Sequence, residues 1–257
     1  MFDQQTVPGC APVTLGADER IDDLQLQGLR IIQKKRGFRF GMDAVLLADF
    51  ARVEERDRVA DFGTGTGILP LLLAGRGRGA HFDALEIQSD MADMAKRSVA
   101  LNGLTERIAV HHLPVEAADG VVQPGSLDGI VCNPPYGVAG TTLVNPGKEL
   151  SLARHQTQEG LTEWYRMAYR LLRGKGRFHM VYPAPRMLGA MTELSKARLE
   201  PKRFRLIYPY ADKPANLVLI EAMKDAKPML HPEPPLIVYE KDGSMTAELK
   251  RIYHITD

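Results

Sequence analysis

The chain has 257 residues, of which 44% are hydrophobic and 25% are charged. This composition is typical of a globular protein with a substantial core, and it excludes an intrinsically disordered chain. The 33 Lys and Arg residues nearly balance the 32 Asp and Glu residues, so any contact with a polyanion must come from local clusters of charge. The sequence contains two cysteines, Cys10 and Cys132, which excludes a disulfide framework and a cysteine-rich zinc site.

The start of the chain and its apolar runs bear on the compartment. The first ten residues, MFDQQTVPGC, contain no basic segment followed by an apolar one, so no signal peptide is expected. The longest apolar runs, such as ILPLLLAG, fall far short of the roughly 20 residues that cross a bilayer. We therefore expect a soluble, cytoplasmic protein without a membrane partner.

The first 58 residues predict a hairpin followed by a helix. Residues 21–40 alternate loosely between apolar and polar side chains and contain a glycine turn, which is typical of strand and turn. In the next stretch, MDAVLLADFARV, three apolar residues have helical spacing and Asp43 lies near the start. We expect residues 1–58 to form an extension that packs on a catalytic domain of residues 59–257.

From Val59 onward, short apolar strands alternate with helices. The expected strands contain VADFG, HFDALE, RIAVHH, LDGIVCN and RFHMVYP, and the expected helices contain GILPLLLAG, MADMAKRSVALNG and LTEWYRMAYRLLRG. This alternation predicts βαβ units and a parallel sheet. After a helix in MLGAMTELSKARL, the closely spaced FRLIYPY and ANLVLIEAM predict an antiparallel pair at the sheet edge. The last segment, PPLIVYEKDGSMTAEL, predicts two strand-like runs around an Asp242-Gly243 turn.

A glycine-rich segment, DFGTGTG, places Asp61, Gly63, Gly65 and Gly67 between a strand and a helix. Glycines allow a sharp turn and the close approach of a ligand, and the start of a helix offers free N–H groups. Dinucleotide enzymes use similar loops, but Asp61 would repel a pyrophosphate and suits a cationic, amino-bearing ligand. Glu86 ends the next strand, where a carboxylate can accept ribose hydroxyls. These features favour S-adenosylmethionine over NAD, with a tight turn in an unrelated α/β protein as the alternative.

The sequence Asn133-Pro134-Pro135-Tyr136 follows the fourth expected strand. Two prolines cannot continue a central strand, so the chain leaves the sheet at its carboxyl edge, where such folds bind ligands. The Asn133 side chain and the Pro134 carbonyl oxygen can accept both hydrogens of a planar amino group, and the Tyr136 ring offers a stacking face. These contacts favour a pyramidal nitrogen whose lone pair points at a methyl sulfonium. A plain Pro-Pro turn capped by asparagine is the alternative.

In this order, DFGTGTG, FDALE and NPPY resemble the class I S-adenosylmethionine-dependent methyltransferases that modify exocyclic amino groups. The NPPY motif is shared by adenine-N6 enzymes and by enzymes that methylate glutamine in release factors. The stretches LQLQGLRIIQKKRGFRFGMDAVLLADFA, ARHQ, RGKGRFHMVYPAPR, LEPKRFRLIYP and PPLIVYEKDGSMTAE resemble the bacterial tRNA (adenine-N6) methyltransferases. Those enzymes act on adenosine 37 of a valine tRNA, and the resemblance runs roughly from Asp22 to Tyr253.

The resemblance implies a Rossmann-like α/β fold with a mostly parallel seven-stranded sheet, an antiparallel edge strand and helices on both faces. It implies that Asn133, Pro134 and Tyr136 are catalytic. The residues that it implies for binding of S-adenosylmethionine are Met42, Asp43, Asp61, Gly63, Thr64, Gly65, Gly67, Glu86, Ile87, Glu116 and Asn133, with Phe40 in the segment before them. Relatives carry an acid near the cofactor adenine after the third strand, where this chain has Leu113 and Pro114 and Glu116 is the substitute.

Three basic clusters are candidates for contact with RNA, in residues 30–39, 164–192 and 196–205. Basic side chains interleaved with aromatic ones suit phosphate neutralisation and base stacking, although each cluster is equally consistent with a solvated face. The residues predicted to contact RNA are Lys34, Lys35, Arg36, Arg154, His155, Lys202 and Arg203.

We therefore expect an N6-adenine methyltransferase that uses S-adenosylmethionine and acts on tRNA. No metal is expected, because His111 and His112 are adjacent rather than at ligand spacing. The oligomeric state stays open, with a monomer favoured. The alternatives are a protein-glutamine methyltransferase, an enzyme acting on rRNA or DNA, and a non-catalytic RNA-binding protein. The hairpin and helix before the glycine loop disfavour the glutamine enzyme, for which a helical substrate-recognition domain would be expected.

Overall fold

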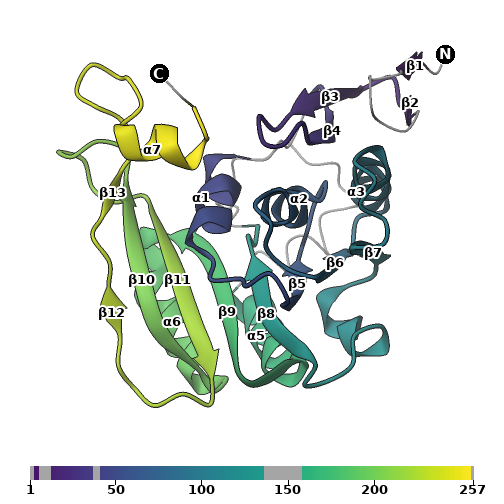
Figure 1. Cartoon of the computed structure of the whole chain (residues 1–257). Coiled ribbons are helices and arrows are strands. Elements are labelled where there is room, and N and C mark those ends of the chain that lie inside the picture. The colour runs from purple at the N-terminus through teal and green to yellow at the C-terminus, as the bar shows by residue number, and fades with distance from the viewer. Residues whose placement is uncertain (1–2, 6–12, 37–40, 136–157, 256–257) are drawn as a thin grey trace.

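The strands expected after residue 58 form one sheet in the computed structural model, which describes residues 3–5, 13–36, 41–135 and 158–255 (Figure 1). The strands of this sheet are β5 (Arg58–Phe62), β6 (His81–Glu86), β7 (Ile108–His112), β8 (Leu127–Cys132), β9 (Leu172–Pro183), β10 (Leu199–Tyr208), β11 (Leu217–Lys224), β12 (His231–Pro232) and β13 (Leu236–Ile237). Within the described residues, the order is β12-β10-β11-β9-β8-β5-β6-β7, and β13 also pairs with β10.

The sheet is mostly parallel, as the alternation of strands and helices predicts. Strands β7, β6, β5, β8 and β9 pair in parallel, whereas β11 is antiparallel to both β9 and β10. The expected antiparallel pair is therefore confirmed, but its antiparallel member lies one strand inside the edge. The described sheet has nine strands rather than the expected seven, because β12 and β13 add to the edge at β10. These two strands have two residues each and are too short to give a periodic sequence pattern.

Helices cover both faces of this sheet. They are α1 (Met42–Phe50), α2 (Ile68–Gly75), α3 (Ser89–Leu101), α5 (Gln158–Leu171), α6 (Met187–Lys196) and α7 (Ala247–Ile252), with 3-10 turns η1 (Val115–Gly120) and η2 (Ala184–Arg186). Because successive strand residues face opposite sides, Val59 joins a core with α1 and α2, whereas Ala60 joins a second core with α5 and α6. The helices α5 and α6 lie behind the sheet in Figure 1.

The N-terminal hairpin packs at one end of the sheet. Strands β3 (Glu19–Asp23) and β4 (Arg30–Lys34) are antiparallel, as predicted, and β1 (Asp3–Gln5) pairs with β2 (Val13–Leu15) beside them. The Ser98 hydroxyl of α3 accepts a hydrogen bond from the Ile32 amide at 2.9 Å, and Asn102 bonds both backbone groups of Arg30. The hairpin is thus held on α3, and the division of the chain at residue 58 stays a prediction.

The C-terminal segment differs from the expectation of two strand-like runs. Tyr239 and Met245 form a short antiparallel bridge across the Asp242-Gly243 turn, but the residues from Ala247 onward form the helix α7 instead of a second strand. The Thr246 side chain caps this helix by accepting a hydrogen bond from the Leu249 amide at 3.3 Å, and Leu249 and Ile252 are buried in the core with α1. A capping residue followed by apolar residues three apart favours a helix, which outweighs the strand-like composition.

Candidate functional site

The motifs singled out in the sequence meet at the carboxyl ends of three neighbouring strands. Strand β5 lies between β6 and β8, so the glycine loop after β5 is flanked by Glu86 at the end of β6 and by Asn133 after β8. The chain continues from β5 to β6 and β7 on one side, then returns to β8 and β9 on the other. Open α/β sheets bind their ligands at this reversal of strand order.

The glycine loop leaves room for a ligand at one position and packs tightly at another. Gly63 and Gly65 have φ angles of +71° and +59°, a backbone conformation that residues other than glycine rarely adopt. A Cβ atom on Gly65 would meet no heavy atom within 4 Å, whereas one on Gly63 would lie 3.0 Å from the Trp164 ring. A ligand can therefore approach the backbone at Gly65, while Gly63 allows Trp164 to pack beneath the loop.

Glu86 holds the glycine loop against the start of α3. Its Oε2 accepts a hydrogen bond from the Gly65 amide and its Oε1 accepts one from the Gln88 amide, both at 2.8 Å. Burial raises the pKa of Glu86, and the two backbone donors act against that increase. Each carboxylate oxygen keeps a second acceptor site, so these bonds are compatible with the predicted contact to ribose hydroxyls.

Asp61 is fully buried at the end of β5, and it has no partner among the described residues. Neither carboxylate oxygen makes a hydrogen bond, and the buried Thr64 hydroxyl makes none either. Burial raises the pKa of Asp61 to about 7, while the nearby Thr64 hydroxyl acts against this increase and the Glu86 charge adds to it. Buried polar groups are nearly always paired, so an unpaired carboxylate beside an open glycine loop fits a ligand that carries an amino or cationic group.

The rim of this site is partly apolar. Ile87 follows Glu86 and is 37% exposed, which offers an apolar surface at the end of β6. Glu116, predicted to replace the missing acid near the cofactor adenine, accepts a hydrogen bond from Trp164 Nε1 at 3.2 Å. The Trp164 ring in turn meets Phe62 edge-on at 6.2 Å. Sequence reasoning missed the role of Trp164 at this site. The one feature of the sequence that could have drawn attention to it is that the chain contains a single tryptophan.

The start of α1 lies on the α2 side of the sheet. Met42 is half-buried against the core that contains α1 and α2, and the Asp43 Oδ1 accepts a hydrogen bond from the Ala44 amide at 2.9 Å. Burial, the Tyr239 hydroxyl and the charge of Asp43 raise the pKa of Tyr253, the residue after α7, to about 12. The predicted cofactor contacts of Met42 and Asp43 stay predictions.

Asn133 is half-buried and Pro134 is buried directly after β8. Because Phe62 pairs with Cys132 across β5 and β8, Asn133 lies level with the first glycine of the loop. Cys132 is fully buried, as expected, and burial raises the pKa of its thiol. Four residues singled out in the sequence lie outside the described residues, namely Tyr136, Arg154, His155 and Phe40.

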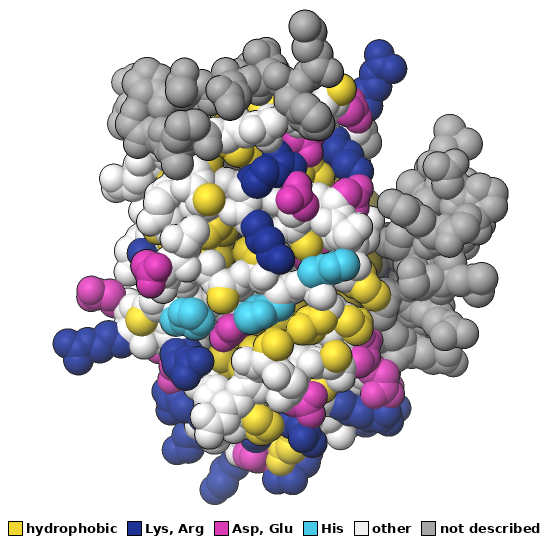
Figure 2. Space-filling view, turned by 90° about the vertical axis from the view of Figure 1, so that its right-hand side faces the viewer, with side chains coloured by type: hydrophobic (Ala, Val, Ile, Leu, Met, Phe, Trp, Pro, Cys, Tyr) yellow, Lys and Arg dark blue, Asp and Glu magenta, His cyan; other side chains and the backbone are white. Residues whose placement is uncertain are grey.

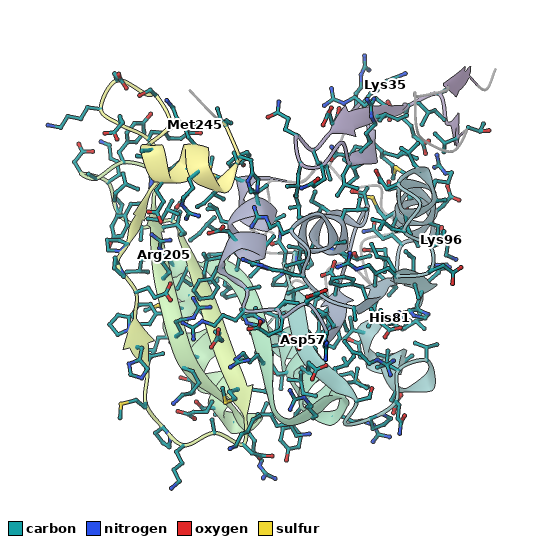
Figure 3. The ribbon with its side chains drawn as sticks, in the orientation of Figure 1. Lys35, Asp57, His81, Lys96, Arg205 and Met245 are labelled. Carbon is teal, nitrogen blue, oxygen red and sulfur yellow. The ribbon has the colours of Figure 1, made fainter. Side chains whose placement is uncertain are left out.

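The predicted basic clusters lie at opposite ends of the sheet. Lys35 and Arg36 are exposed on the hairpin, and Lys34 pairs with Asp90 of α3. Lys202 lies on β10 and donates a hydrogen bond to the Lys227 carbonyl at 3.0 Å. Figure 3 labels Lys35 and Lys96 around the hairpin and α3, with Arg205 on the other side of the molecule.

Arg203 is not available to RNA, so the prediction for this residue was wrong. Its side chain is buried, with hydrogen bonds to Glu221 at 2.8 Å, to Glu233 at 2.7 Å and to the Phe50 carbonyl at 2.7 Å. The guanidinium also lies 3.7 Å from the centre of the Phe50 ring. The inward-facing position of Arg203 on β10 places its charge in the core between β10, β11 and the end of α1.

The carboxylate of Glu221 completes this buried cluster. His179, which is fully buried on β9, places Nε2 3.4 Å from Glu221, and the Arg52 amide lies 3.2 Å from the same ring nitrogen. Burial alone would raise the pKa of Glu221, but His179 and Arg203 together hold it at about 2. The cluster therefore holds an ionised acid that already has its partners.

Two histidines lie near the edge of the sheet that is remote from β10, where β6 pairs with β7. His111 Nε2 lies 2.9 Å from the Asp83 Oδ1, and His81 Nε2 lies 3.6 Å from the same oxygen. Figure 2, which looks onto this side of the molecule, shows histidine side chains around an acidic one. In the part of the chain that the structure describes, no group of three or more His, Cys, Asp or Glu residues could hold a metal ion. None of the described helices is both long and apolar enough to cross a bilayer.

Comparison with known proteins places this geometry among methyltransferases. Residues 41–182 match the family model described as the methyltransferase small domain. The tRNA1(Val) (adenine(37)-N6)-methyltransferase of Parabacteroides distasonis is 30% identical over 229 residues, which cover 88% of this chain and 90% of that protein. The enzyme of the same name from Tolumonas auensis is 30% identical over 227 residues, which cover 85% and 89%.

Solved structures confirm the predicted fold class. A protein of Agrobacterium tumefaciens described as a predicted O-methyltransferase superposes with a TM-score of 0.65 at 24% identity, over 83% of this chain and 96% of that chain. A T. thermophilus 16S rRNA N2 G1207 methyltransferase, solved with AdoMet and guanosine, gives a TM-score of 0.57 at 19% identity, over 82% and 52%. The architecture is that of the class I methyltransferases.

Proposed function

Because the chain belongs to the methyltransferase small domain family, we propose that it methylates the exocyclic N6 of an adenine in tRNA, namely adenosine 37 of a valine tRNA. The chain is a methyltransferase that uses S-adenosylmethionine, as the family and the solved relatives agree. The observation that carries the choice of an amino group as acceptor is the position of Asn133 and Pro134, level with the glycine loop at the reversal of strand order. A tRNA substrate would place the protein in the cytoplasm.

The residues around the glycine loop fit the cofactor. When bound, S-adenosylmethionine supplies an electrophilic methyl group on a positively charged sulfur. We assign the amino and cationic end of this molecule to Asp61, whose buried carboxylate has no partner in the described residues. The open space at Gly65 admits the backbone approach, Glu86 accepts ribose hydroxyls, and the exposed face of Ile87 contacts the adenine ring.

Asn133 and Pro134 prepare the acceptor nitrogen. The Asn133 side-chain oxygen and the Pro134 carbonyl oxygen each accept one hydrogen of the adenine amino group. These bonds draw the nitrogen out of conjugation, so that its lone pair becomes available in one fixed direction. No strong base is needed beforehand, because the amino proton can leave to water after the new bond has formed. The two prolines keep both acceptors in place, since their φ angles are fixed by the ring.

The test is methyl transfer from labelled S-adenosylmethionine to unmodified valine tRNA, with nucleoside mass spectrometry of the product. We expect N6-methyladenosine in this tRNA and none when adenosine 37 is replaced by guanosine. A strain that lacks the gene should lose the same nucleoside from one valine tRNA. Methylated glutamine in a release factor, with unmodified tRNA, would instead support the protein-glutamine alternative.

A further inference from the structure

A second cavity lies beside the proposed methylation site, and we propose that it binds a nucleotide adjacent to the target adenosine in single-stranded RNA. Its volume is about 420 Å³, within the range of small-molecule sites. Strand β9 lines it with Tyr182, α5 lines it with Leu161 and Tyr165, η2 contributes Arg186, and α6 contributes Glu193. This inference rests on the proposed function, because it extends the RNA beyond the methylated base.

The position of the cavity follows from strand register. Cys132 of β8 pairs with Met180 of β9, so Tyr182 lies level with Pro134 on the neighbouring strand. Neighbouring strands are about 4.8 Å apart, so the cavity begins about one strand width from the residues that hold the target amino group. A base next to the methylated adenosine can therefore reach it without a large change in the path of the RNA.

The walls of the cavity are aromatic and fixed. Tyr165 is 1% exposed, meets Phe178 edge-on at 5.7 Å and donates a hydrogen bond to the Met180 sulfur at 3.7 Å. Tyr182 is also buried. Single-stranded RNA is recognised partly by contacts between its unpaired bases and aromatic side chains, and these two buried rings, which line the cavity and are already held in place, lose little entropy on binding.

The two charged residues give the cavity a direction. Arg186 is exposed, and a guanidinium binds phosphate with two parallel hydrogen bonds. Glu193 is half-buried and accepts one hydrogen bond from Lys196 at 2.7 Å, which leaves further acceptor sites on its carboxylate. A carboxylate repels phosphate but accepts hydrogens from exocyclic amino groups. The phosphate therefore lies at Arg186 and the base at Glu193, and a base with an amino group is preferred over uracil.

Other basic residues of the same sequence cluster are engaged elsewhere. Arg170 pairs with Asp119 and Arg173 pairs with Asp128, both near the end of α5 that is remote from the cavity. Arg186 is thus the member of the 164–192 cluster that lines the cavity. The structure separates one RNA-binding candidate from residues whose charges serve the fold.

The test is equilibrium binding of a fluorescent single-stranded RNA heptamer with a central adenosine, measured by anisotropy. We expect Arg186→Ala to weaken binding about tenfold, consistent with the loss of one good contact to a nucleotide. Arg56→Ala is the matched control, because Arg56 is exposed before β5 at the opposite edge of the sheet, and it should change binding less than about twofold.

A second variant tests the base itself. Glu193→Gln should weaken binding of a heptamer that has cytosine next to the central adenosine. On the side of the adenosine that enters the cavity, replacing this cytosine by an abasic residue should remove the effect of Glu193→Gln. The loss of affinity caused by Glu193→Gln and the loss caused by the abasic residue would then be non-additive, as expected for two groups in direct contact. Glu55→Gln, at the exposed amino edge, is the control for the charge change.

The outcomes separate this inference from the proposed function. The nucleotide site would be overturned if Arg186→Ala and Arg56→Ala lowered RNA affinity equally. It would also be overturned if the effects of Glu193→Gln and of an abasic residue were fully additive on both sides of the adenosine. Thermal unfolding of each variant excludes misfolding as the cause. If these binding effects are seen while the wild-type protein methylates no RNA, the proposed function fails and the nucleotide site stands. If tRNA is methylated and the binding effects are absent, the reverse holds.

Discussion

Two buried acids in the same sheet have opposite electrostatic states. Asp61 at the end of β5 has no partner in the described residues, and burial raises its pKa to about 7. Glu221 on β11 is also buried, yet His179 and Arg203 hold its pKa at about 2. The first acid is costly to ionise in the free protein, whereas the second is ionised at neutral pH.

This contrast distinguishes a residue that awaits a ligand from one that supports the fold. Glu221 pairs with Arg203 of β10 and lies beside His179 of β9, so its cluster is complete without any other molecule. The carboxylate of Asp61 is completed only by a positively charged or amino-bearing group. Burial alone does not distinguish a functional acid from a structural one, so the proposed role of Asp61 rests on burial without a hydrogen-bond partner at the carboxyl edge of a parallel sheet.

The largest expected effect is on stability, from removal of the Glu221 partner. Arg203→Ala leaves an ionised Glu221 buried, so we expect the free energy of unfolding to fall by about 3–5 kcal/mol. Arg205→Ala is the control, since Arg205 pairs with the partly exposed Glu248 and should cost about 1 kcal/mol or less. Urea unfolding measures both. Similar losses in the two variants would mean that the cluster contributes no more than a surface pair.

The second-largest expected effect is on turnover, at the site that contains Asp61. Asn133→Ala should lower kcat by roughly 100–1000-fold, because the lost contact acts on the amino group in the transition state. The affinity for S-adenosylmethionine, measured by calorimetry, should change less than about twofold. A parallel loss of cofactor affinity would assign Asn133 a structural role after β8.

Removing the charge of Asp61 should separate binding from stability. Asp61→Asn should weaken S-adenosylmethionine binding by roughly 10–100-fold, since a buried charge contact is lost. The same change should stabilise the free protein at pH 8 by at least about 1 kcal/mol, which raises Tm by about 2–4 °C. Asp83→Asn is the control for cofactor affinity, because Asp83 is equally buried but pairs with His111. A destabilised Asp61→Asn variant would mean that the Asp61 carboxylate, like that of Glu221, supports the fold.

The pH dependence of cofactor binding provides a sharper form of this test. Below pH 7 Asp61 is protonated in the free protein, so affinity should rise up to about tenfold per pH unit until pH 7 and then level off. The contribution of Asp61 to stability has the opposite sign, since a raised pKa removes stability as pH rises from about 4 to 7. The contribution of Glu221 is present above about pH 4.5 and is lost as pH falls toward 2. Affinity that is independent of pH in the wild type would exclude Asp61 as the titrating group.

The smallest expected effect concerns the glycine loop. Gly65→Ala and Gly28→Ala impose the same strain, because both glycines have positive φ angles and open space around a Cβ atom. Each should cost about 1 kcal/mol of stability. Gly28 lies in the turn between β3 and β4, so only Gly65→Ala should also weaken cofactor binding. If calorimetry shows equal cofactor affinity in the two variants, the space at Gly65 is not used by the cofactor.

The glycine loop and its neighbours were predictable because their signals are local. Asp61, Glu86 and Asn133 each follow a short apolar strand, and parallel strands bring such positions to one edge of a sheet. Their shared edge followed from the expected strand order, without knowledge of any particular side-chain contact. The same holds for the hairpin and for the helices α1 to α3, whose apolar spacing and turn residues lie within each segment.

Arg203 shows where local reasoning fails. Its partner carbonyl on Phe50 is 153 residues away in the sequence, and a basic residue in a charged stretch is usually solvated. The alternation along β10 gives no signal for its burial, because a bulge between Pro201 and Arg203 turns Arg203 toward Phe50 and the α1 side of the sheet. Leu199, by contrast, is buried on the α5 and α6 side. Trp164 was missed for a related reason, since its contact with the glycine loop joins α5 to β5.

The way in which the hairpin is held on α3 bears on how such a protein changes over evolutionary time. Ser98 and Asn102 of α3 bond the backbone of β4 rather than its side chains. Exposed residues of the hairpin, such as Lys35 and Arg36, therefore take no part in these bonds. Mutations at these two positions should therefore leave the bonds between β4 and α3 intact, so selection can change this exposed surface without loosening the hairpin.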